Sequence, residues 1–372
     1  MVVLQEVFEQ FDTSGGKLIN VMPHGGGHIN DTYISLFETK QGPRRCLLQR
    51  INHQVFRQPA LVMENIERVT RYAREQIQAE GGDPARETLA LIPTRDGNWF
   101  YRTPSGEFWR CYQFVDGTVT FEVAGNLELV YEAAAAFGRF LTLLHNLPGP
   151  RLHETIPGFH HTRRRFEDFQ AALQADRANR AALVQPEIAF ILAREKDASV
   201  VVDLLASGGL PERIVHNDTK LNNVLIDERS GRGICVIDLD TVMPGSPLYD
   251  FGDLIRMGAA CAAEDEPDLA KVGYDMARFE ALARGYLSEA GSLLVPVEWD
   301  LLAFAGRLIT YEQAMRFLGD YLNGDRYYKI QHPRHNLDRA RTQIKMLEAM
   351  ERQQDAMQAV ITRLRSLHAS AE

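Results

Sequence analysis

Residues 216–223 read HNDTKLNN, and the apolar run ICVI at 234–237 leads directly into Asp238. Between these two segments lies DERSG at 227–231, a cluster of turn-forming residues. Short apolar runs on either side of such a turn predict a β-hairpin. Asn223 and Asp238 can then face each other across that hairpin. The pattern H-x-D-x-x-x-x-N, followed by an apolar strand that ends in Asp, is therefore expected to form one polar site.

The residue types in this pattern suit phosphoryl transfer. Asp218 can accept the proton of an attacking hydroxyl group, because a loose phosphoryl transition state needs only a weak base within hydrogen-bond reach. Asn223 and Asp238 offer oxygen ligands to Mg²⁺, a hard cation whose coordination is completed by phosphate oxygens and water. Each Asp taken alone is also a common turn or capping residue. The joint pattern at fixed offsets favours the catalytic interpretation.

Three nearby polar residues are interpreted differently. We expect His216 to order the loop through a hydrogen bond rather than to transfer a proton. Asp240 is either a second metal contact or part of a solvated turn. Asp250 belongs to an Asp-Phe-Gly tripeptide, which binds metal in protein kinases, but here it follows prolines instead of an apolar strand. We therefore expect Asp250 to hydrogen-bond the catalytic loop or to cap the next helix.

Outward from the hairpin, the chain divides into a strand-rich part and a helix-rich part. Strands are predicted at 18–21, 32–37, 46–51, 89–93, 99–102 and 108–115, with one helix at 60–78. Helices are predicted at 126–147, 163–182, 186–206, 276–290, 299–322 and 335–368. The patterns indicate an α+β fold, with a small antiparallel sheet in an N-terminal lobe and a larger helical C-terminal lobe.

The composition is that of an ordinary folded protein. The 372 residues are 45% hydrophobic and 24% charged, and the formal net charge is -9. This acidic balance disfavours contacts with a phosphate backbone, so we expect no nucleic-acid partner. The sequence shows neither a membrane-spanning run nor a secretory signal. The four cysteines form no C-x-x-C pair, and we expect a cytoplasmic protein without a membrane partner.

Three stretches of the chain resemble known proteins: GGGHINDTY at 25–33, HNDTKLNN at 216–223 and RFLGDYLNGD at 316–325. The catalytic motif looks like that of the aminoglycoside phosphotransferase and choline kinase superfamily. All three stretches together are similar to the N-acetylhexosamine 1-kinase group. The resemblance implies a two-lobed protein-kinase-like fold, with a nucleotide-binding lobe at 1–115 and a lobe at 116–372 that carries the catalytic hairpin and the acceptor site.

The resemblance also implies how ATP would be held. Gly25, Gly27 and Asn30 would lie on a loop that closes over the nucleotide phosphates, with His28 near the reacting sugar hydroxyl. Backbone amides can approach phosphate closely where side chains are absent. The strand position that normally carries a phosphate-binding lysine falls at Arg50, which keeps the charge on a longer, forked side chain.

Two further nucleotide contacts follow from the same resemblance. The ion-pair partner of Arg50 would come from the following helix, as Glu64 or Glu67, with Glu64 preferred. Phe114 and Val115 would belong to a hinge between the lobes whose backbone meets adenine. The alternative interpretation of this segment is an exposed strand end.

The acceptor residues implied by the resemblance are Arg316, Asp320 and Tyr321, together with Asn217 on the catalytic loop. Residues 316 and 320 are four apart and share one helix face, which is also the spacing of a plain surface ion pair. A guanidinium or carboxylate group offers paired donors or acceptors, which suits vicinal hydroxyl groups. We therefore expect the sugar to lie between Asp218 and this helix.

These features together imply an ATP- and Mg²⁺-dependent small-molecule kinase. The resemblance favours transfer to the anomeric hydroxyl of an N-acetylhexosamine. Two alternatives stay open: a kinase of another small alcohol, such as an aminoglycoside, methylthioribose or an amino alcohol, and a non-catalytic nucleotide-binding module, suggested by Arg50 in place of lysine. The apolar spacing of the last predicted helix is compatible with a monomer or a homodimer.

Overall fold

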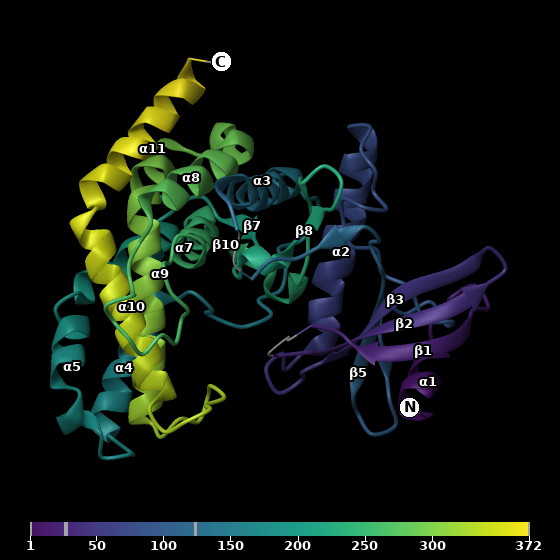
Figure 1. Ribbon diagram of the computed structural model, residues 1–372, viewed down its shortest axis with the longest axis horizontal. Helices are drawn as coiled ribbons and strands as arrows, with labels where there is room; N and C mark the ends of the chain where they lie inside the picture. Colours follow the sequence, from purple (N-terminus) through teal and green to yellow (C-terminus); the bar gives the residue numbers. More distant parts are fainter. Residues whose placement is uncertain (1, 26–28, 123–124, 371–372) are drawn as a thin grey trace.

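The computed structural model describes residues 2–25, 29–122 and 125–370. They form two lobes, a small one built on an antiparallel sheet and a larger helical one (Figure 1). The predicted α+β class and the two-lobed arrangement are confirmed. Residues 114–117 connect the lobes between strands β5 and β6.

The sheet of the small lobe has five strands in the order β1-β2-β3-β5-β4, all antiparallel. Its elements are β1 (Lys17–Pro23), β2 (Asp31–Thr39), β3 (Gly42–Ile51), β4 (Tyr101–Arg102) and β5 (Phe108–Gln113), with helix α1 (Val2–Phe8) beside it. The strand predicted at 89–93 is wrong, because Leu91 forms only an isolated bridge to Tyr112. The sequence patterns also missed α1.

The two faces of β3 lie in different environments. Cys46 and Leu48 join the small hydrophobic cluster that α1 covers. Leu47 and Ile51 pack against the main core, which contains residues of both lobes. Because strand side chains alternate between faces, Gln49 lies on the face of Ile51, and Arg50 lies on the opposite face.

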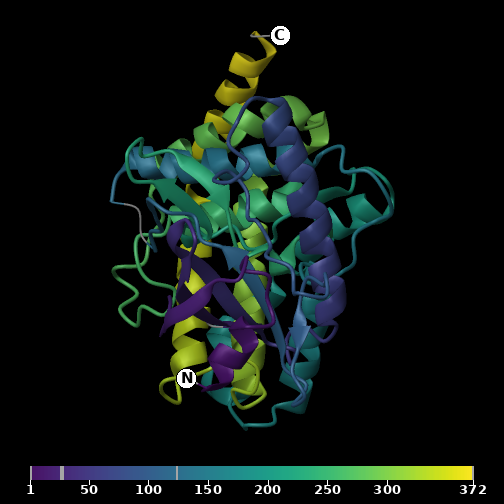
Figure 2. The same cartoon turned by 90° about the vertical axis from the view of Figure 1, so that its right-hand side faces the viewer.

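Helix α2 (Pro59–Ala79) links the sheet to the large lobe, with a buried stripe that includes Val62, Ile66 and Val69. Figures 1 and 2 show it running alongside the sheet, next to the helical lobe. The Asn65 amide donates to the backbone oxygens of His153 and Val242 at 2.8 and 3.1 Å. These bonds fix α2 to the large lobe.

Nine helices build most of the described part of the large lobe. They are α3 (Leu127–Leu144), α4 (Thr162–Ala175), α5 (Gln185–Leu192), α6 (Val200–Ala206), α7 (Pro247–Gly258), α8 (Met276–Ala290), α9 (Pro296–Leu322), α10 (His335–Arg352) and α11 (Gln354–Ala369). Helix α9 is buried on all sides, as expected for a helix at the centre of a bundle. The predicted helix at 335–368 divides at Gln353, and the one at 186–206 divides around a 3₁₀ turn. No helix within the described ranges has the length and apolarity needed to cross a bilayer.

Short strands hold the middle of the large lobe together. The predicted hairpin is confirmed as β8 (Val224–Asp227) and β9 (Gly233–Val236), with β6 (Thr118–Val119) as a third strand beside β8. A second pair, β7 (Arg213–Val215) and β10 (Met243–Gly245), flanks the polar segments at both ends. The residues of the catalytic motif thus lie between two rigid strand pairs.

Candidate active site

Asp218 lies on the loop between β7 and β8, and its side chain is 24% exposed. One carboxylate oxygen is 2.8 Å from Lys220 Nζ, and the other accepts a hydrogen bond from Asn223 Nδ2 at 3.2 Å. Burial alone would raise the pKa of Asp218, but the charge of Lys220 and these bonds outweigh it and lower the pKa below its usual value. Asp218 is therefore an oriented, ionised carboxylate at neutral pH.

The hairpin brings Asn223 next to Asp238. The backbone oxygen of Asn223 accepts a hydrogen bond at 2.9 Å from the amide of Ile237, the residue that precedes Asp238. Asp238 has a left-handed backbone conformation with a φ of 61°. Such a conformation is uncommon for a residue other than glycine and often marks a functional site.

Asp238 is exposed to solvent, although surrounding protein atoms partly desolvate its carboxylate. This partial desolvation, together with the carboxylates of Asp240 and Asp218, raises the pKa of Asp238 to about 7, against the opposing charges of Arg110 and Lys220. A divalent cation beside Asp238 would relieve this repulsion.

The available donors fit Mg²⁺. Among the described residues, no group of three or more His, Cys, Asp and Glu side chains is arranged to hold a metal ion. Asn223 and Asp238 supply two oxygen ligands, which suits a cation that completes its shell with phosphate oxygens and water. The assignment of these two residues as Mg²⁺ ligands stays a prediction.

Asp250 shapes the backbone of the catalytic loop. Its carboxylate accepts hydrogen bonds from the amides of His216 and Asn217 at 2.8 and 2.6 Å, and its backbone oxygen accepts one from Thr219 Oγ1. The His216 ring lies 2.9 Å from the backbone oxygen of Ile237. The predicted structural roles of Asp250 and His216 are confirmed.

Asn217 is buried and holds the neighbouring loop instead of facing solvent. Its side-chain amide donates to the backbone oxygen of Thr241 at 2.9 Å, and its φ is 66°. The predicted contact between the Asn217 side chain and the acceptor does not fit this geometry, because the amide is already used inside the protein.

The predicted ion pair between Arg50 and Glu64 is wrong. Arg50 pairs with Asp31 and Glu107, on the sheet face opposite α2. Glu64 instead lies 3.0 Å from the His153 ring. Side chains alternate along a strand, so Arg50 points away from α2 while its neighbours Gln49 and Ile51 lie on the α2 face.

The charged group on the α2 face of the sheet is Arg110, which the sequence patterns missed. It lies on β5 opposite Gln49 and forms a buried ion pair with Asp240. Asp240 is therefore not part of a solvated turn, and both of its carboxylate oxygens accept hydrogen bonds within the protein, while the alternative of a second metal contact stays untested. A lone arginine among Phe108, Trp109 and Cys111 was the available signal, because a charge in an apolar strand needs a buried partner.

The glycine loop is described only at its edges. Gly25 has a φ of 71°, which favours glycine, and a side chain there would meet open space. Gly27 and His28, predicted to contact the phosphates and the sugar, lie outside the described residues. Asn30 is buried, and its amide donates to Asp240 Oδ2 at 2.6 Å. Asn30 thus ties the end of this loop to the large lobe.

Phe114 and Val115 lie on the connection between the two lobes. The Arg45 guanidinium group stacks 4.1 Å above the centre of the Phe114 ring. The backbone oxygen of Val115 accepts a hydrogen bond from Thr118 Oγ1 at 2.9 Å. Contact of this segment with adenine stays a prediction.

Asp320 and Tyr321 support a loop. The buried Asp320 carboxylate accepts hydrogen bonds at 2.9, 2.9 and 3.0 Å from three successive amides, those of residues 326–328. The buried Tyr321 ring packs 4.4 Å from the Arg180 guanidinium group. The Asp320 carboxylate is thus engaged within the protein, and contact of these two side chains with the sugar stays a prediction.

Arg316 does lie close to the catalytic loop. Two side chains connect Arg316 to that loop, His160 and Glu312. One nitrogen of the His160 ring lies 3.1 Å from the Asn217 backbone oxygen, and the other lies 3.0 Å from Glu312 Oε1. Arg316 is 3.8 Å from Glu312, not paired with Asp320. Burial opposes protonation of His160, but the Glu312 carboxylate outweighs it and raises the pKa of His160.

Aromatic rings surround Arg316. Its guanidinium group lies 5.5 Å from the ring centre of Phe159 and 5.7 Å from that of Tyr328. The Tyr328 ring in turn meets Tyr327, which is 64% exposed, edge to face at 4.8 Å. Tyr327 thus presents an accessible aromatic ring, which no motif or periodic pattern in the sequence indicates.

The acidic run at 264–266, near this region, has basic side chains beside each of its carboxylates. Glu264 pairs with Arg256 at 2.8 Å, Asp265 lies 3.0 Å from the His335 ring, and Glu266 lies 3.7 Å from Lys271. The run of three carboxylates at 264–266 therefore does not form an unpaired acidic pocket.

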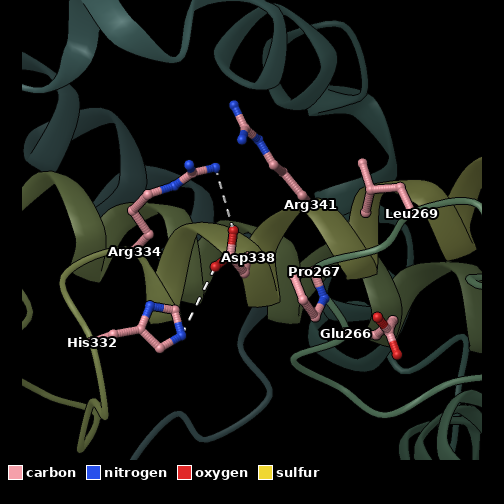
Figure 3. A pocket seen from close by; sticks show the side chains of 7 residues that line it. All are labelled: Glu266, Pro267, Leu269, His332, Arg334, Asp338 and Arg341. Atoms are coloured by element: carbon pink, nitrogen blue, oxygen red, sulfur yellow. Dashed lines mark ion pairs between the residues drawn. The ribbon is translucent and has the colours of Figure 1, made fainter.

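Two cavities lie close to the segments discussed above. One of about 270 Å³ lies between the lobes, with Ile29, Asn52 and Glu107 on one side and Lys329 on the other. A larger cavity of about 470 Å³ lies at the start of α10 and is lined by Glu266, Pro267, Leu269, His332, Arg334, Asp338 and Arg341 (Figure 3). Because Asp338 there pairs with Arg334 and His332, this larger cavity offers no unpaired acid or base.

Comparisons with known proteins agree with the fold. The model of the phosphotransferase enzyme family matches residues 20–291. An aminoglycoside phosphotransferase from Alicyclobacillus acidocaldarius superposes with a TM-score of 0.55 at 16% identity, over 98% of this chain and 95% of that one. A choline/ethanolamine kinase family protein from Mesorhizobium loti gives 0.55 at 14% identity, over 98% and 99% of the two chains.

A third similar structure is a spectinomycin phosphotransferase in complex with ADP and spectinomycin. Its TM-score is 0.52 at 14% identity, over 90% of this chain and 93% of that one. Identities at this level carry information on the fold alone. They confirm the predicted kinase-like fold class.

Proposed function

The chain belongs to the phosphotransferase enzyme family, and on that premise we propose that it transfers the γ-phosphate of ATP to a hydroxyl group of a small neutral sugar. The favoured acceptor is the anomeric hydroxyl of an N-acetylhexosamine. This hydroxyl is more acidic than the others of the ring, so a carboxylate suffices as its base.

Asp218 would take the proton of the acceptor hydroxyl. Lys220 and Asn223 each hold one oxygen of its carboxylate, which limits rotation of the side chain and leaves it ionised. Lys220 is itself partly exposed, and the Asp218 charge raises its pKa, so it stays cationic beside the phosphate that is being transferred. Mg²⁺ held by Asn223 and Asp238 would supply further neutralisation of the triphosphate charge.

The choice of a neutral acceptor rests on one observation, the pairing of Glu312 and of the three carboxylates at 264–266 with basic side chains. Glu312 is neutralised by His160 and Arg316, and the carboxylates at 264–266 have their own partners. A cationic acceptor would need uncompensated carboxylates. A guanidinium group framed by aromatic rings suits instead a hydroxylated ring with one apolar face.

The alternative of a non-catalytic nucleotide-binding module was suggested by Arg50 in place of lysine. Arg50 lies on the face of the sheet opposite α2, so its identity does not argue against catalysis. The ionised Asp218 and the adjacent Lys220 support turnover.

A panel of matched acceptors with ATP and Mg²⁺ tests the proposal. N-acetylglucosamine and glucosamine differ by one acetyl group, which converts a neutral sugar into a cationic one. We expect phosphorylation of N-acetylglucosamine or its 4-epimer to exceed that of the free amine at least about tenfold, since a polar group of the site left without its partner costs about 1–3 kcal/mol. Phosphorus NMR of the product would locate the phosphate on the anomeric carbon.

The control is the methyl glycoside of the same sugar, whose anomeric oxygen is blocked. It should not be phosphorylated. Preferred turnover of glucosamine, an aminoglycoside or an amino alcohol would contradict the neutral acceptor, and phosphorylation of the methyl glycoside would contradict transfer to the anomeric oxygen.

A further inference from the structure

Arg110 connects the two lobes through a buried ion pair. It lies on β5, and the side chains of Arg110 and Asp240 are only 1% and 3% exposed. Its Nε and Nη2 also donate to Gln49 Oε1 at 2.8 and 2.6 Å, and Nη1 lies 3.9 Å from Met63 Sδ. Because the donor groups of the guanidinium are all engaged within the protein, Arg110 does not bind a phosphate group directly.

Asp240 joins three separate segments through one carboxylate. Both oxygens accept hydrogen bonds from Arg110, and Oδ2 also accepts one from Asn30 at 2.6 Å. Asn30 ends the glycine loop, and its own side-chain oxygen accepts from the amide of Asn52 at 2.9 Å. The carboxylate therefore ties β5 and the end of the glycine loop to the segment that follows β9.

The residues after Asp240 are held in the same way. The backbone oxygen of Thr241 accepts from Asn217 at 2.9 Å, and that of Val242 accepts from Asn65 of α2 at 3.1 Å. Asp238, two residues before Asp240, has a left-handed backbone. Such a conformation persists in a residue other than glycine only where neighbouring contacts fix it.

We propose that Arg110 is a positioning residue for the divalent-cation site. By holding Asp240, it fixes the backbone that presents Asp238, and the shared carboxylate also holds Asn30 beside the same segment. This inference rests on the proposed function, in which Asp238 and Asn223 hold Mg²⁺ beside the triphosphate. The ion pair between β5 and the large lobe would then hold the site in place, in the position of the Arg50–Glu64 pair that the resemblance implied.

The test separates positioning from stability. Removal of one partner leaves a buried charge, whereas replacement of both partners by apolar residues of similar volume is often neutral or stabilising. We expect Arg110→Met to lower the melting temperature by about 5 °C or more. The double variant Arg110→Met/Asp240→Leu should recover most of that loss.

The decisive measurement is calorimetric binding of Mg²⁺ together with a non-hydrolysable ATP analogue. In the double variant we expect the apparent Mg²⁺ affinity to be about 10- to 100-fold weaker, although its stability is restored. The kcat for the sugar should fall in parallel, while the KM for the sugar changes little. A structural role alone would restore binding together with stability, and native Mg²⁺ affinity in the double variant would overturn the proposal.

Arg110→Met alone separates positioning from direct ligation. If Asp240 were a metal ligand blocked by Arg110, its release would strengthen Mg²⁺ binding. If Arg110 positions the segment that carries Asp238, Arg110→Met should bind Mg²⁺ more weakly than wild type. Stronger binding would overturn the proposal.

A matched control is Arg213→Met, which removes one partner of the buried pair between Arg213 and Glu298 within the large lobe. It should lower the melting temperature and leave the Mg²⁺ dependence of analogue binding unchanged. A wild-type protein that binds no Mg²⁺–analogue complex would overturn both proposals. One that binds the complex but phosphorylates no sugar would overturn only the acceptor, and the binding comparison would still decide the role of Arg110.

Discussion

Asp218 differs from the other carboxylates of the site because it is ionised, partly exposed and held at both oxygens. We expect Asp218→Asn to lower kcat by at least about 10²-fold, since the amide keeps the shape of the side chain but cannot accept the proton. Binding of the Mg²⁺–analogue complex and the melting temperature should stay close to wild type. A variant that retains more than about a tenth of wild-type turnover would contradict the assignment of Asp218 as base.

Asp238 makes stability depend on pH in the absence of metal. Its pKa is about 7 in the folded protein against an ordinary value of 3.8, so between these values the folded state binds more protons than the unfolded state. Stability from this group is therefore present at low pH and is lost as the pH rises through about 7. We expect Asp238→Asn in a metal chelator to melt above wild type at pH 8, and the difference to disappear below about pH 4.

Addition of Mg²⁺ and the ATP analogue should reverse that order at pH 8, because only wild type gains full stabilisation from the bound complex. Thermal unfolding of both proteins across this pH range is the measurement. A difference between them that does not change with pH would show that Asp238 does not titrate near neutrality.

The sequence predicted the residues that lie close together along the chain. Asn223 and Asp238 sit at the ends of one short hairpin, so local strand and turn signals were enough to place them. The contact between Arg110 and Asp240 joins positions 130 residues apart, and no local pattern reports such a pair. The predicted ion pair between Arg50 and Glu64 was wrong for another reason. Side chains alternate along a strand, so residues 49 and 50 lie on opposite faces of the sheet.

Helices α3 and α8 pack closely through two glycines. A β-carbon at Gly285 would lie 2.2 Å from the backbone oxygen of Tyr131, and one at Gly138 would lie 2.3 Å from that of Tyr286. Because these neighbours are backbone atoms, they cannot move without separating the helices. We expect Gly285→Ala to lower the free energy of unfolding by about 1–3 kcal/mol, as measured by urea titration.

Gly319 of α9 provides the matched control. A β-carbon there would lie 3.8 Å from the nearest atom, which is ordinary van der Waals contact. Gly319→Ala should therefore raise the free energy of unfolding, by up to about 1 kcal/mol, through helix propensity alone. Equal effects of the two substitutions would contradict the close approach of α3 and α8.

The loop that follows α9 covers part of the helix face from which the resemblance implied contacts with the acceptor. Gly324 and Asp325 have positive φ angles, which turn the chain back so that the next amides meet Asp320. The spacing of Arg316 and Asp320 identified a shared helix face, but it held no information on what would cover that face. The same loop presents Tyr327 to solvent.

At the scale of the whole molecule, the main hydrophobic core crosses the boundary between the lobes. It contains Ile51 of the sheet, the buried stripe of α2 and residues of α3 and α7–α9. We expect calorimetry to show one unfolding transition, with equal calorimetric and van't Hoff enthalpies. Two separate transitions would show that the lobes unfold independently.

Asn65→Leu tests the polar part of this connection. It removes the bonds to His153 and Val242 and leaves buried backbone groups unsatisfied, which costs about 1–3 kcal/mol each. The transition should move to a lower temperature and remain single, because the apolar contacts of α2 persist. Two separate transitions in Asn65→Leu would show that the Asn65 bonds are what makes the two lobes unfold together.

The α+β fold class could be predicted from the order of strand and helix patterns along the chain. Strand alternation before residue 116 and helical periodicity after it separated the two lobes, because each pattern reflects which faces are buried. The placement of α2 was not accessible in this way. Its apolar stripe predicted a helix, while its attachment to the large lobe depends on Asn65, which reads as an ordinary polar position.

The attachment of α2 limits how this helix can move. Asn65 lies in the first half of the helix, and any rotation of α2 away from the large lobe would have to break its bonds to His153 and Val242. We therefore expect α2 to travel with the large lobe, so that opening of the space between the lobes would displace the strands of the sheet relative to this helix.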